Sequence, residues 1–344
     1  MKRRNVFLVL FLTFWVVVTS LGFYGYQVFK SANVLVGREA RVLLISKGSD
    51  FKAVQDSLRT GEFLRDPVSF GLLAKLLRYN QHIKPGRYLL KPDMSNLSAI
   101  RYLRSGDQLP VDITFNNIRL KKDLAEKITA NLEITQAEFL KALNDSATAG
   151  KYGFDLENFM AMFIPNTYEV YWNIGVEGLF DRMHREYSKF WHEEKKQKAA
   201  AIGLSPVEVS VLASIVYAES SKNEEIPKIA GLYMNRLKRN IALQADPTLI
   251  FAAQDFTIQR VLNKHKEIES PYNTYKYTGL PPGPINLPPI IALEGVLNYE
   301  QHHYIYMCAR EDFSGYHNFA TNLNDHLNNA RRYQRALNKA KLFR

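Results

Sequence analysis

The chain opens with three basic residues followed by a long apolar stretch, and this feature constrains its fold more than any other. Lys2, Arg3 and Arg4 precede an uncharged segment that runs from Val6 to Phe29. A segment of this length can cross a bilayer as one helix. It is longer than the apolar core of a usual signal peptide, and no A-x-A-like cleavage site follows it. We therefore favour a retained anchor over a cleaved signal peptide.

The basic cluster also predicts the orientation of this anchor. Under the positive-inside rule the N-terminus stays in the cytoplasm, and residues from about 30 onward cross the membrane. The formal net charge of +11 suits nucleic acid, an anionic membrane surface or an acidic polymer. Export makes nucleic acid the least suitable of these three partners. The single cysteine, Cys308, cannot form an intramolecular disulfide, so packing alone must hold the exported part together.

The residues after the anchor predict a mixed α+β fold built from short elements. Two strands enclose two helices, and a third helix follows before Gly106: the ranges are Arg41–Ser46, Ser49–Leu58, Val68–Leu77, Ile83–Leu90 and Leu97–Leu103. Pro110 marks a boundary, after which a strand and two helices are expected at Val111–Phe115, Lys121–Leu132 and Gln136–Leu143. The charged segment His184–Lys198 predicts a solvated helix. We divide the chain into residues 1–30, 31–109, 110–200 and 201–344.

One helix carries the strongest chemical signal. Ser205-Pro206-Val207-Glu208 is a capping box with proline at the first helical position. Counting on from this start, Glu219 falls seven residues after Leu212, in line with the apolar stripe of the helix. Partial burial and the negative end of the helix dipole would both raise the pKa of this carboxyl group. A carboxyl that stays protonated near neutral pH can act as a general acid at a glycosidic bond.

Two other interpretations of Glu219 remain open from this helix alone. The side chain could emerge into solvent where the helix frays, or it could pair with Lys222. A second helix is expected over Glu224–Lys238, with its apolar face in the core. Six of the 14 prolines then lie between Pro271 and Pro289. This stiff segment suits either the wall of a groove or a rigid surface connection.

Seven sequence blocks, taken together, resemble the endolytic murein transglycosylases, the MltG or YceG-like family. They occur in that family's order over roughly 110 residues, which makes coincidence improbable. The blocks are Ala213-Ser214-Ile215-Val216-x-x-Glu219-Ser220, Ile229-Ala230-Gly231, Asn235-Arg236-Leu237, Leu243-Gln244-x-Asp246-Pro247-Thr248, Tyr272-Asn273-Thr274-Tyr275, Gly279-Leu280-Pro281-Pro282-Gly283-Pro284-Ile285 and His317-x-Phe319-x-Thr321-Asn322.

The resemblance implies an architecture and an activity. The architecture is a transmembrane helix, a small LysM-like βααβ subdomain and a mixed α+β catalytic domain. The activity is cleavage of the bond between MurNAc and GlcNAc in peptidoglycan, without cofactor or metal. Glu219 would protonate the leaving oxygen and then deprotonate the C6 hydroxyl of the muramic acid ring, which attacks its own C1. The product would carry a 1,6-anhydro-MurNAc end, and one carboxyl group would suffice, in contrast to ordinary glycosidases.

The same blocks supply the candidate substrate-binding residues, which are Ser220, Asn235, Gln244, Asp246, Thr248, Tyr272, Asn273, Asn286 and His317. Three of them have structural alternatives. Asp246 could cap a helix or turn before Pro247, Ser220 could orient Glu219 or cap the helix end, and His317 could be a structural histidine. The histidines at 302, 303, 317 and 326 match no standard zinc-ligand spacing, so we expect no metal site.

Three positions depart from the family pattern. Tyr217 stands where many relatives carry another glutamate, Asn166 replaces an aspartate, and Leu287-Pro288-Pro289 replaces an Asn-Pro-Gly run. These changes put a second carboxylate at position 217 in doubt but leave Glu219 in place. Expected partners are peptidoglycan glycan strands and the cytoplasmic membrane, with the catalytic domain on its outer, periplasmic side; cell-wall synthases and division proteins are further candidates. The alternatives are a noncatalytic peptidoglycan-binding or division-scaffold protein and a muramidase-type hydrolase.

Overall fold

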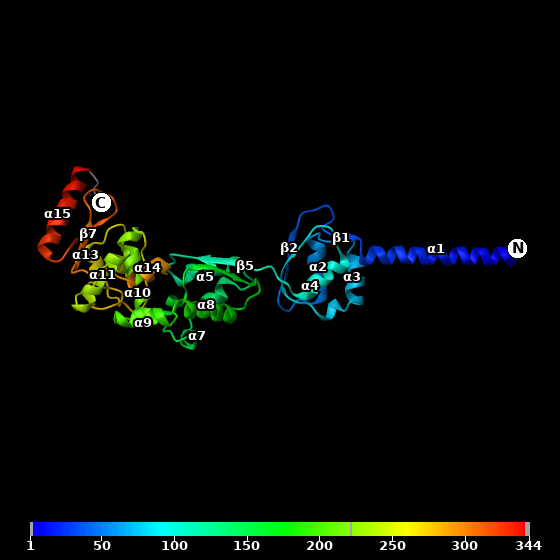
Figure 1. Cartoon of the computed structure of the whole chain (residues 1–344), viewed down its shortest axis with the longest axis horizontal. Coiled ribbons are helices and arrows are strands. Elements are labelled where there is room, and N and C mark those ends of the chain that lie inside the picture. Colours follow the sequence, from blue (N-terminus) through cyan, green and yellow to red (C-terminus); the bar gives the residue numbers. More distant parts are fainter. Residues whose placement is uncertain (1–2, 221, 341–344) are drawn as a thin grey trace. The chain divides into compact units, whose positions relative to one another are not determined.

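A computed structural model of the chain describes residues 3–220 and 222–340. The described residues form a mixed α+β structure, as the sequence predicts (Figure 1). They divide into two compact units. The first contains residues up to Asp112 together with Asn131–Ile134 and Glu169–Gly175, and the second contains Ile113–Ala130, Thr135–Tyr168 and the chain from Val176 onward. The expected boundary at residue 200 stays a prediction.

The first unit combines the apolar N-terminal helix with small antiparallel sheets. Its helices are α1 (Arg3–Phe29), α2 (Phe51–Thr60), α3 (Pro67–Leu76), the 3₁₀ turn η1 (Tyr79–Gln81) and α4 (Asn96–Ser105). Its strands are β1 (Ala32–Val34), β2 (Arg41–Ile45), β3 (Gly86–Leu90) and β4 (Met94–Ser95). Strand β2 pairs antiparallel with β3, and β1 with β4. The order β2, α2, α3, β3 confirms the predicted strand, helix, helix, strand arrangement.

Side-chain caps explain where the helices of the first unit begin. Asp50 accepts the backbone N–H of Ala53, and Asp66 accepts the N–H groups of Val68 and Ser69. Helix α4 ends at Gly106, whose φ of 76° lies in the left-handed region that glycine adopts readily. The apolar faces of these helices and of the β2–β3 pair enclose one hydrophobic core.

The second unit is mainly helical. Its helices and 3₁₀ turns are α5 (Lys121–Thr129), α6 (Gln136–Leu143), α7 (Ser146–Lys151), η2 (Phe159–Met162), α8 (Val176–Phe190), α9 (Glu193–Ala201), α10 (Pro206–Glu219), η3 (Asn223–Glu225), α11 (Ile226–Lys238), α12 (Asp246–Ala253), α13 (Asn263–Lys266), α14 (Ile290–Leu297) and α15 (Leu323–Lys339). Strand β5 (Val111–Phe115) pairs with β6 (Asn166–Val170), and most residues of both belong to this unit. Strand β7 (Tyr306–Ala309) pairs with β8 (His317–Ala320).

One predicted element of this unit is wrong in its extent. The segment His184–Lys198 is divided between α8 and α9 and is not one solvated helix. Trp191 lies at the break and is fully buried, with its ring against those of Tyr187 and Phe190. Burial of this large aromatic side chain outweighs the local charge pattern. The proline-rich segment, by contrast, runs from the end of α13 to the start of α14 without regular structure, as predicted.

Candidate active site

Helix α10 carries Glu219 into a cavity of the second unit. The helix begins at the predicted capping box: Ser205 Oγ accepts the N–H of Glu208 at 3.2 Å, and Glu208 Oε2 accepts the N–H of Ser205 at 2.7 Å. The residues from Val209 to Val216 are buried on all sides, which fixes the helix in the core. Glu219 is its last residue. The carboxyl group therefore stands at the end of a rigid element.

The cavity has a volume of about 410 Å³. Side chains from α10, α11, the segment before α12, the start of α12, the loop after α13, β7 and α15 line it. The lining residues are Glu219, Leu232, Tyr233, Arg236, Leu243, Gln244, Asp246, Tyr275, Tyr306, Met307, Leu323, His326 and Leu327. We call Glu219, Tyr233, Arg236, Gln244, Asp246 and Tyr275 the cavity cluster.

Glu219 is only partly exposed, and burial is the main cause of its altered acidity. Burial and, to a smaller extent, the nearby negative charge of Asp246 raise the pKa of Glu219 from 4.5 to about 7. The hydroxyl of Tyr233 donates to Glu219 Oε1 at 2.6 Å and acts in the opposite direction by stabilising the anion. Lys222 does not pair with Glu219, because its Nζ lies over the ring of Tyr316. The group is thus poised to give and take a proton near neutral pH.

Gln244 and Asp246 are exposed to the cavity, and each is held by a neighbour. Arg236 donates from Nη2 to Gln244 Oε1 at 2.6 Å, which leaves the Nε2 protons of Gln244 as donors. Gln244 also has a φ of 54°, a backbone conformation uncommon outside glycine and often stabilised at functional sites. Asp246 accepts a short hydrogen bond from the hydroxyl of Tyr275. The helix cap before Pro247 is Ala245, so Asp246 is not the capping residue.

Three other predicted residues hold the surrounding backbone. Asn235 donates to the carbonyl oxygens of His302 and Tyr304 at 2.7 and 3.0 Å. Thr248 is buried and donates to the carbonyl oxygen of Ala245. Tyr272 packs against Phe251 in the wall of the unit. None of the three is among the residues that line the 410 Å³ cavity.

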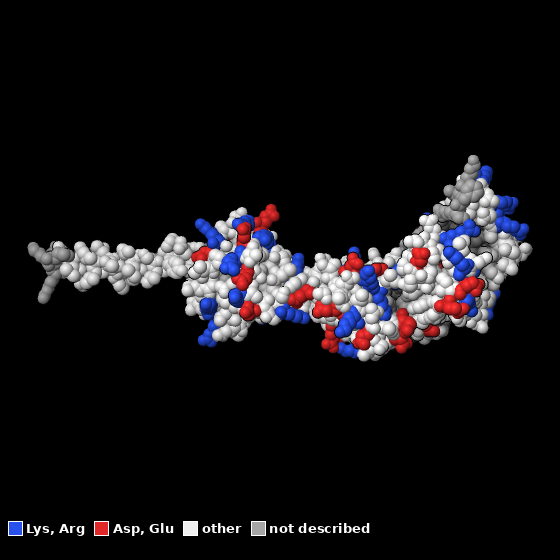
Figure 2. Space-filling model, turned by 180° about the vertical axis from the view of Figure 1, so that it is seen from behind, with Lys and Arg blue, Asp and Glu red and all other residues white. Residues whose placement is uncertain are grey.

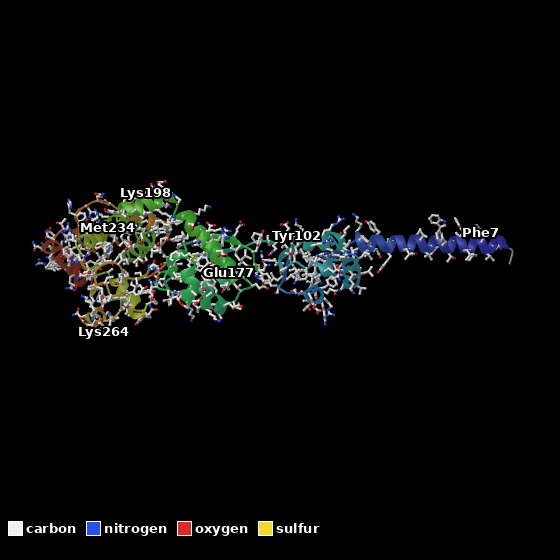
Figure 3. All side chains as sticks on the ribbon, turned by 90° about the horizontal axis from the view of Figure 1, so that it is seen from below. Phe7, Tyr102, Glu177, Lys198, Met234 and Lys264 are labelled. Atoms are coloured by element: carbon white, nitrogen blue, oxygen red, sulfur yellow. The ribbon has the colours of Figure 1, made fainter. Side chains whose placement is uncertain are left out.

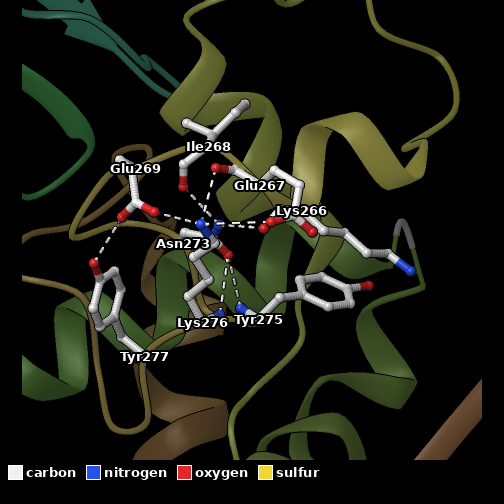
Figure 4. Close-up of polar contacts among 8 residues, drawn as sticks. All are labelled: Lys266, Glu267, Ile268, Glu269, Asn273, Tyr275, Lys276 and Tyr277. Carbon is white, nitrogen blue, oxygen red and sulfur yellow. Dashed lines mark hydrogen bonds and ion pairs between the residues drawn. The ribbon is translucent and has the colours of Figure 1, made fainter.

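Asn273 is the centre of a separate polar cluster in the loop after α13 (Figure 4). Its Nδ2 donates to the carbonyl oxygens of Lys266 and Ile268 at 2.9 and 2.8 Å, and its Oδ1 accepts the N–H groups of Tyr275 and Lys276. Around it, the Glu269 carboxylate contacts Lys276 Nζ and the Tyr277 hydroxyl. We call Asn273, Glu269, Lys276 and Tyr277 the loop cluster. Asn273 is fully buried and has all its bonds within the protein.

Ser220 and His317 converge on a buried glutamate that sequence reasoning did not single out. Glu225 Oε2 accepts the Ser220 hydroxyl at 3.2 Å and lies 2.8 Å from His317 Nδ1, while Oε1 accepts the N–H of His317 at 2.9 Å. This arrangement ties the segment after Glu219 to strand β8. Ser220 is the C-cap residue of α10, and its hydroxyl contacts Glu225 and the N–H of Lys222, not Glu219. The bonds of His317 to Glu225 are those of a structural histidine.

Asn286 lies in a smaller hollow beside the end of α10. Its Nδ2 donates to the carbonyl oxygen of Ser214 at 2.9 Å, whereas its buried Oδ1 has no hydrogen-bond partner among the described residues. The hollow has a volume of about 140 Å³ and is also lined by Ala218 and Phe251. The segment before it includes Gly283, where an added Cβ would lie 2.0 Å from the carbonyl oxygen of Glu157. Only glycine permits this approach.

Comparison with known proteins identifies the family of this chain. The YceG-like family matches this chain over residues 43–332. The chain belongs to the YceG-like family. Relatives named endolytic murein transglycosylase share 24% identity over 94% of the chain in Streptococcus pneumoniae R6 and 26% over 78% of the chain in Bacillus subtilis 168. The chain spans 64% of the length of the pneumococcal relative and 78% of that of the Bacillus relative.

A solved structure agrees with the fold of this YceG-like chain. A YceG-like protein from Listeria monocytogenes superposes with a TM-score of 0.55 at 23% identity, and the match covers 84% of this chain and 98% of that one. At this level of identity the likeness concerns the fold.

Sequence reasoning missed most of the partners that surround Glu219 in this YceG-like chain. Tyr233 falls on the apolar face of the helix expected over Glu224–Lys238, and Tyr275 carries no signal beyond its place in a sequence block. A tyrosine on a buried face was a usable signal, because its hydroxyl must find a hydrogen-bond partner. The wall residues Tyr306, Leu323 and Leu327 carried no local signal, since they reach the cavity only through tertiary packing.

Proposed function

We propose that this YceG-like chain is a membrane-anchored lytic transglycosylase that cuts peptidoglycan glycan strands internally. Glu219 carries the proposal: it is a partly buried carboxyl group with a pKa near 7, it lines a cavity, and it is held by Tyr233. A carboxyl group in this state can serve as acid in one step and as base in the next.

The reaction would proceed by two proton transfers at Glu219. The carboxyl proton moves to the oxygen that links MurNAc C1 to the next GlcNAc, and that C–O bond breaks. The C6 hydroxyl of the same MurNAc ring then bonds to C1, and its proton returns to the Glu219 carboxylate. The products are a 1,6-anhydro-MurNAc end and a free GlcNAc hydroxyl, with no water consumed. Intramolecular attack reduces the entropic cost of bringing the nucleophile to C1.

The neighbours of Glu219 take supporting roles in this proposal. Gln244 would donate from Nε2 to a carbonyl or hydroxyl oxygen of the sugar, because Arg236 already occupies its Oε1. Asp246 would keep the pKa of Glu219 high and accept from a sugar hydroxyl. Asn286, whose Nδ2 donates to the carbonyl oxygen of Ser214, and Phe251 would form walls of the smaller hollow, which would receive an acetamido group. Tyr272, Asn273, Asn235 and Thr248 would shape the walls.

Helix α1 would serve as the retained anchor. Asn5–Phe29 is long and apolar enough to cross a membrane, and its side chains from Asn5 to Tyr24 are exposed (Figure 3, where Phe7 projects outward). Its C-terminal end is part of the fold, since Val28 is buried in the core of the first unit and its carbonyl oxygen accepts Asn96 Nδ2 at 3.0 Å. Cleavage after this helix would remove that contact. With Lys2, Arg3 and Arg4 in the cytoplasm, both units would lie outside the cytoplasmic membrane.

The first unit resembles a LysM-like subdomain in its strand, helix, helix, strand order, and we propose that it contacts the glycan strand. Cell-wall synthases or division proteins are the proposed protein partners, because the substrate of this enzyme is their product. Nucleic acid is not expected on this side of the membrane.

Digestion of purified glycan strands tests the activity. The wild-type full-length chain should release fragments with 1,6-anhydro ends, each lighter by one water than a reducing end, whereas Glu219→Gln should release none. Mass spectrometry of the products reads end chemistry and fragment length together. Binding of glycan without any cleavage by the wild type would instead support a noncatalytic wall-binding protein.

A muramidase-type hydrolase is the second candidate, and Asp246 is the observation that favours it. Two carboxylates, Glu219 and Asp246, line the same cavity, and inverting or retaining glycosidases use such a pair. In that case water would be the nucleophile and the products would have reducing ends. Incorporation of ¹⁸O from labelled water into the new ends distinguishes the two reactions.

A further inference from the structure

Helix α3 is apolar on both of its faces, although only one face is covered by protein. Its sequence from Pro67 to Leu76 contains Ser69 and Lys75 as its only polar side chains. One face, with Phe70, Leu73 and Ala74, is completely buried in the core of the first unit. A helix that is apolar all round is normally covered all round, by a protein core or by lipid.

The opposite face of α3 is an exposed apolar stripe. Val68, Leu72 and Leu76 follow one another at intervals of four residues, which places them in a row along the helix. Their exposed fractions are 77%, 54% and 65%. Three large apolar side chains side by side differ from the isolated exposed leucines of an ordinary surface. The stripe therefore requires a covering partner.

The location of α3 identifies this partner. Helices α1 and α3 contact each other, and α3 lies at the end of the first unit from which α1 emerges (Figure 1). The 25 uncharged residues Asn5–Phe29 of α1 form a rod without charged side chains (Figure 2) of about 37 Å at 1.5 Å per residue. The hydrocarbon core of a bilayer is about 30 Å thick. The last turns of α1, and α3 packed against them, thus fall at the level of the lipid headgroups.

Basic side chains flank the stripe. Arg65 precedes α3, Lys75 lies within it and Arg78 follows it, and all three are exposed. A hollow of about 610 Å³ adjoins the start of the helix at Pro67, and Arg38, Arg59 and Arg65 line it together with a single acidic residue, Glu62. Arginine forks suit phosphate oxygens. An apolar stripe edged by cations is typical of a helix that lies in the surface of an anionic membrane.

We propose that α3 rests on the outer surface of the bilayer that holds α1, with Val68, Leu72 and Leu76 inserted among the acyl chains and the flanking arginines at phospholipid phosphates. This inference rests on the proposed role of α1 as an anchor. The first unit then has two attachments to the membrane, one through α1 and one through α3, and these fix its orientation at the bilayer surface.

Spin labelling of the full-length chain in phosphatidylglycerol-containing vesicles tests the proposal. With Cys308 replaced by serine, single cysteines are introduced at Leu72, at Leu44 and at Val16. Leu44 is the matched control, because it is a leucine of similar exposure, at 45%, on strand β2 at the end of the unit away from α1 (Figure 1). Collisions with oxygen report lipid, and collisions with a water-soluble nickel complex report water.

The label at Leu72 should lose most of its nickel collisions and gain oxygen collisions, while the label at Leu44 keeps its nickel collisions. Equal nickel access at Leu72 and Leu44, with Val16 in lipid, would overturn the placement of α3 while the anchor stands, and would assign the stripe to a protein partner. Nickel access at Val16 would remove the anchor itself and the inference with it. Catalysis enters neither readout, so both results are independent of Glu219.

Discussion

The second unit contains two polar clusters of similar composition, and they use their hydrogen bonds in opposite ways. In the loop cluster, both the Nδ2 and the Oδ1 of Asn273 form hydrogen bonds with backbone groups, and the carboxylate of Glu269 contacts Lys276 and Tyr277. In the cavity cluster, Glu219 has one hydrogen-bond partner among the described residues, Tyr233, and it faces the open cavity. A cluster of polar residues is therefore a candidate site when hydrogen bonds within the protein hold each side chain in place and some of its polar atoms remain free to bind a ligand.

Replacement of Glu219 should give the largest difference between the clusters. Glu219→Gln keeps the size of the side chain but cannot donate the required proton, so cleavage of glycan strands should fall at least about 100-fold. The matched control is Glu269→Gln, which removes a carboxylate of the exposed loop and should leave the rate within about twofold. Release of soluble muropeptides measures both. Comparable losses in the two variants would show that the cavity has no special role.

The same replacement should make the protein more stable above neutral pH. The folded-state pKa of Glu219 is about 7, above its ordinary 4.5, so ionisation of this group opposes folding. The loss of folding free energy that results from ionisation of Glu219 is absent below about pH 4.5 and grows as pH rises. It is complete above about pH 7, where it amounts to at most about 3 kcal/mol. Glu219→Gln should therefore melt several degrees higher than the wild type near pH 8 and at nearly the same temperature near pH 4.5.

If the wild type and Glu219→Gln had the same melting temperature as each other at both pH values, the Glu219 carboxyl group would be hydrated, with a pKa near its ordinary value. Glu269→Gln is again the control. Hydrogen bonds from Lys276 and Tyr277 lower the pKa of Glu269, so its ionised form favours folding and its removal should give no gain at high pH.

Loss of Asn273 should destabilise the loop. Asn273→Ala leaves two carbonyl oxygens and two backbone N–H groups without their present partners, and we expect a cost of about 2–4 kcal/mol. Hydrogen exchange of the segment 266–277, followed by mass spectrometry, measures the loss of protection locally. Unchanged protection in this segment would show that water replaces the amide at no cost. Asn235→Ala, in a different part of the unit, controls for general destabilisation.

The sequence predicted the elements of the site better than their contacts. Helix α10 starts at its capping box and ends with Glu219 in line with its apolar stripe, because both features are local. The strand, helix, helix, strand order around α2 and α3 is equally local. Tyr275 and Tyr306 line the same cavity as Glu219 only because the chain returns to α10 after long irregular segments. The periodicity of the sequence does not predict such tertiary contacts. Burial of Trp191 is likewise a tertiary effect, and it divides into two helices a segment whose charges predict one.

The sequence motifs likewise locate residues near the cavity better than they predict the contacts of those residues. Asn235 and Asn273 belong to motifs of the family, yet the structure gives their amides to backbone carbonyls. These two residues hold the shape of the irregular segments beside the cavity, which accounts for their place in the motifs. Gln244 and Asp246 belong to a motif as well, and they line the cavity. A motif alone does not separate residues that build a wall from residues that face the space behind it.

The smallest expected effects concern the pH at which the proposed activity declines. Activity requires protonated Glu219 and should fall as pH rises through about 7. The hydrogen bond from Tyr233 lowers the pKa of Glu219, so Tyr233→Phe should move this decline to higher pH. The charge of Asp246 raises the pKa, so Asp246→Asn should move the decline to lower pH.

These two shifts of opposite sign, each of about one pH unit or less, form a test that simple damage to the site cannot mimic. Profiles of kcat/KM against pH for the wild type and both variants measure them, because kcat/KM reports the free enzyme. Tyr277→Phe, which removes a hydroxyl that contacts Glu269 in the loop cluster, should leave the profile unchanged. If Tyr233→Phe and Asp246→Asn shifted the decline in the same direction, the proton at Glu219 would not control the reaction, and the difference between the two clusters would be one of shape alone.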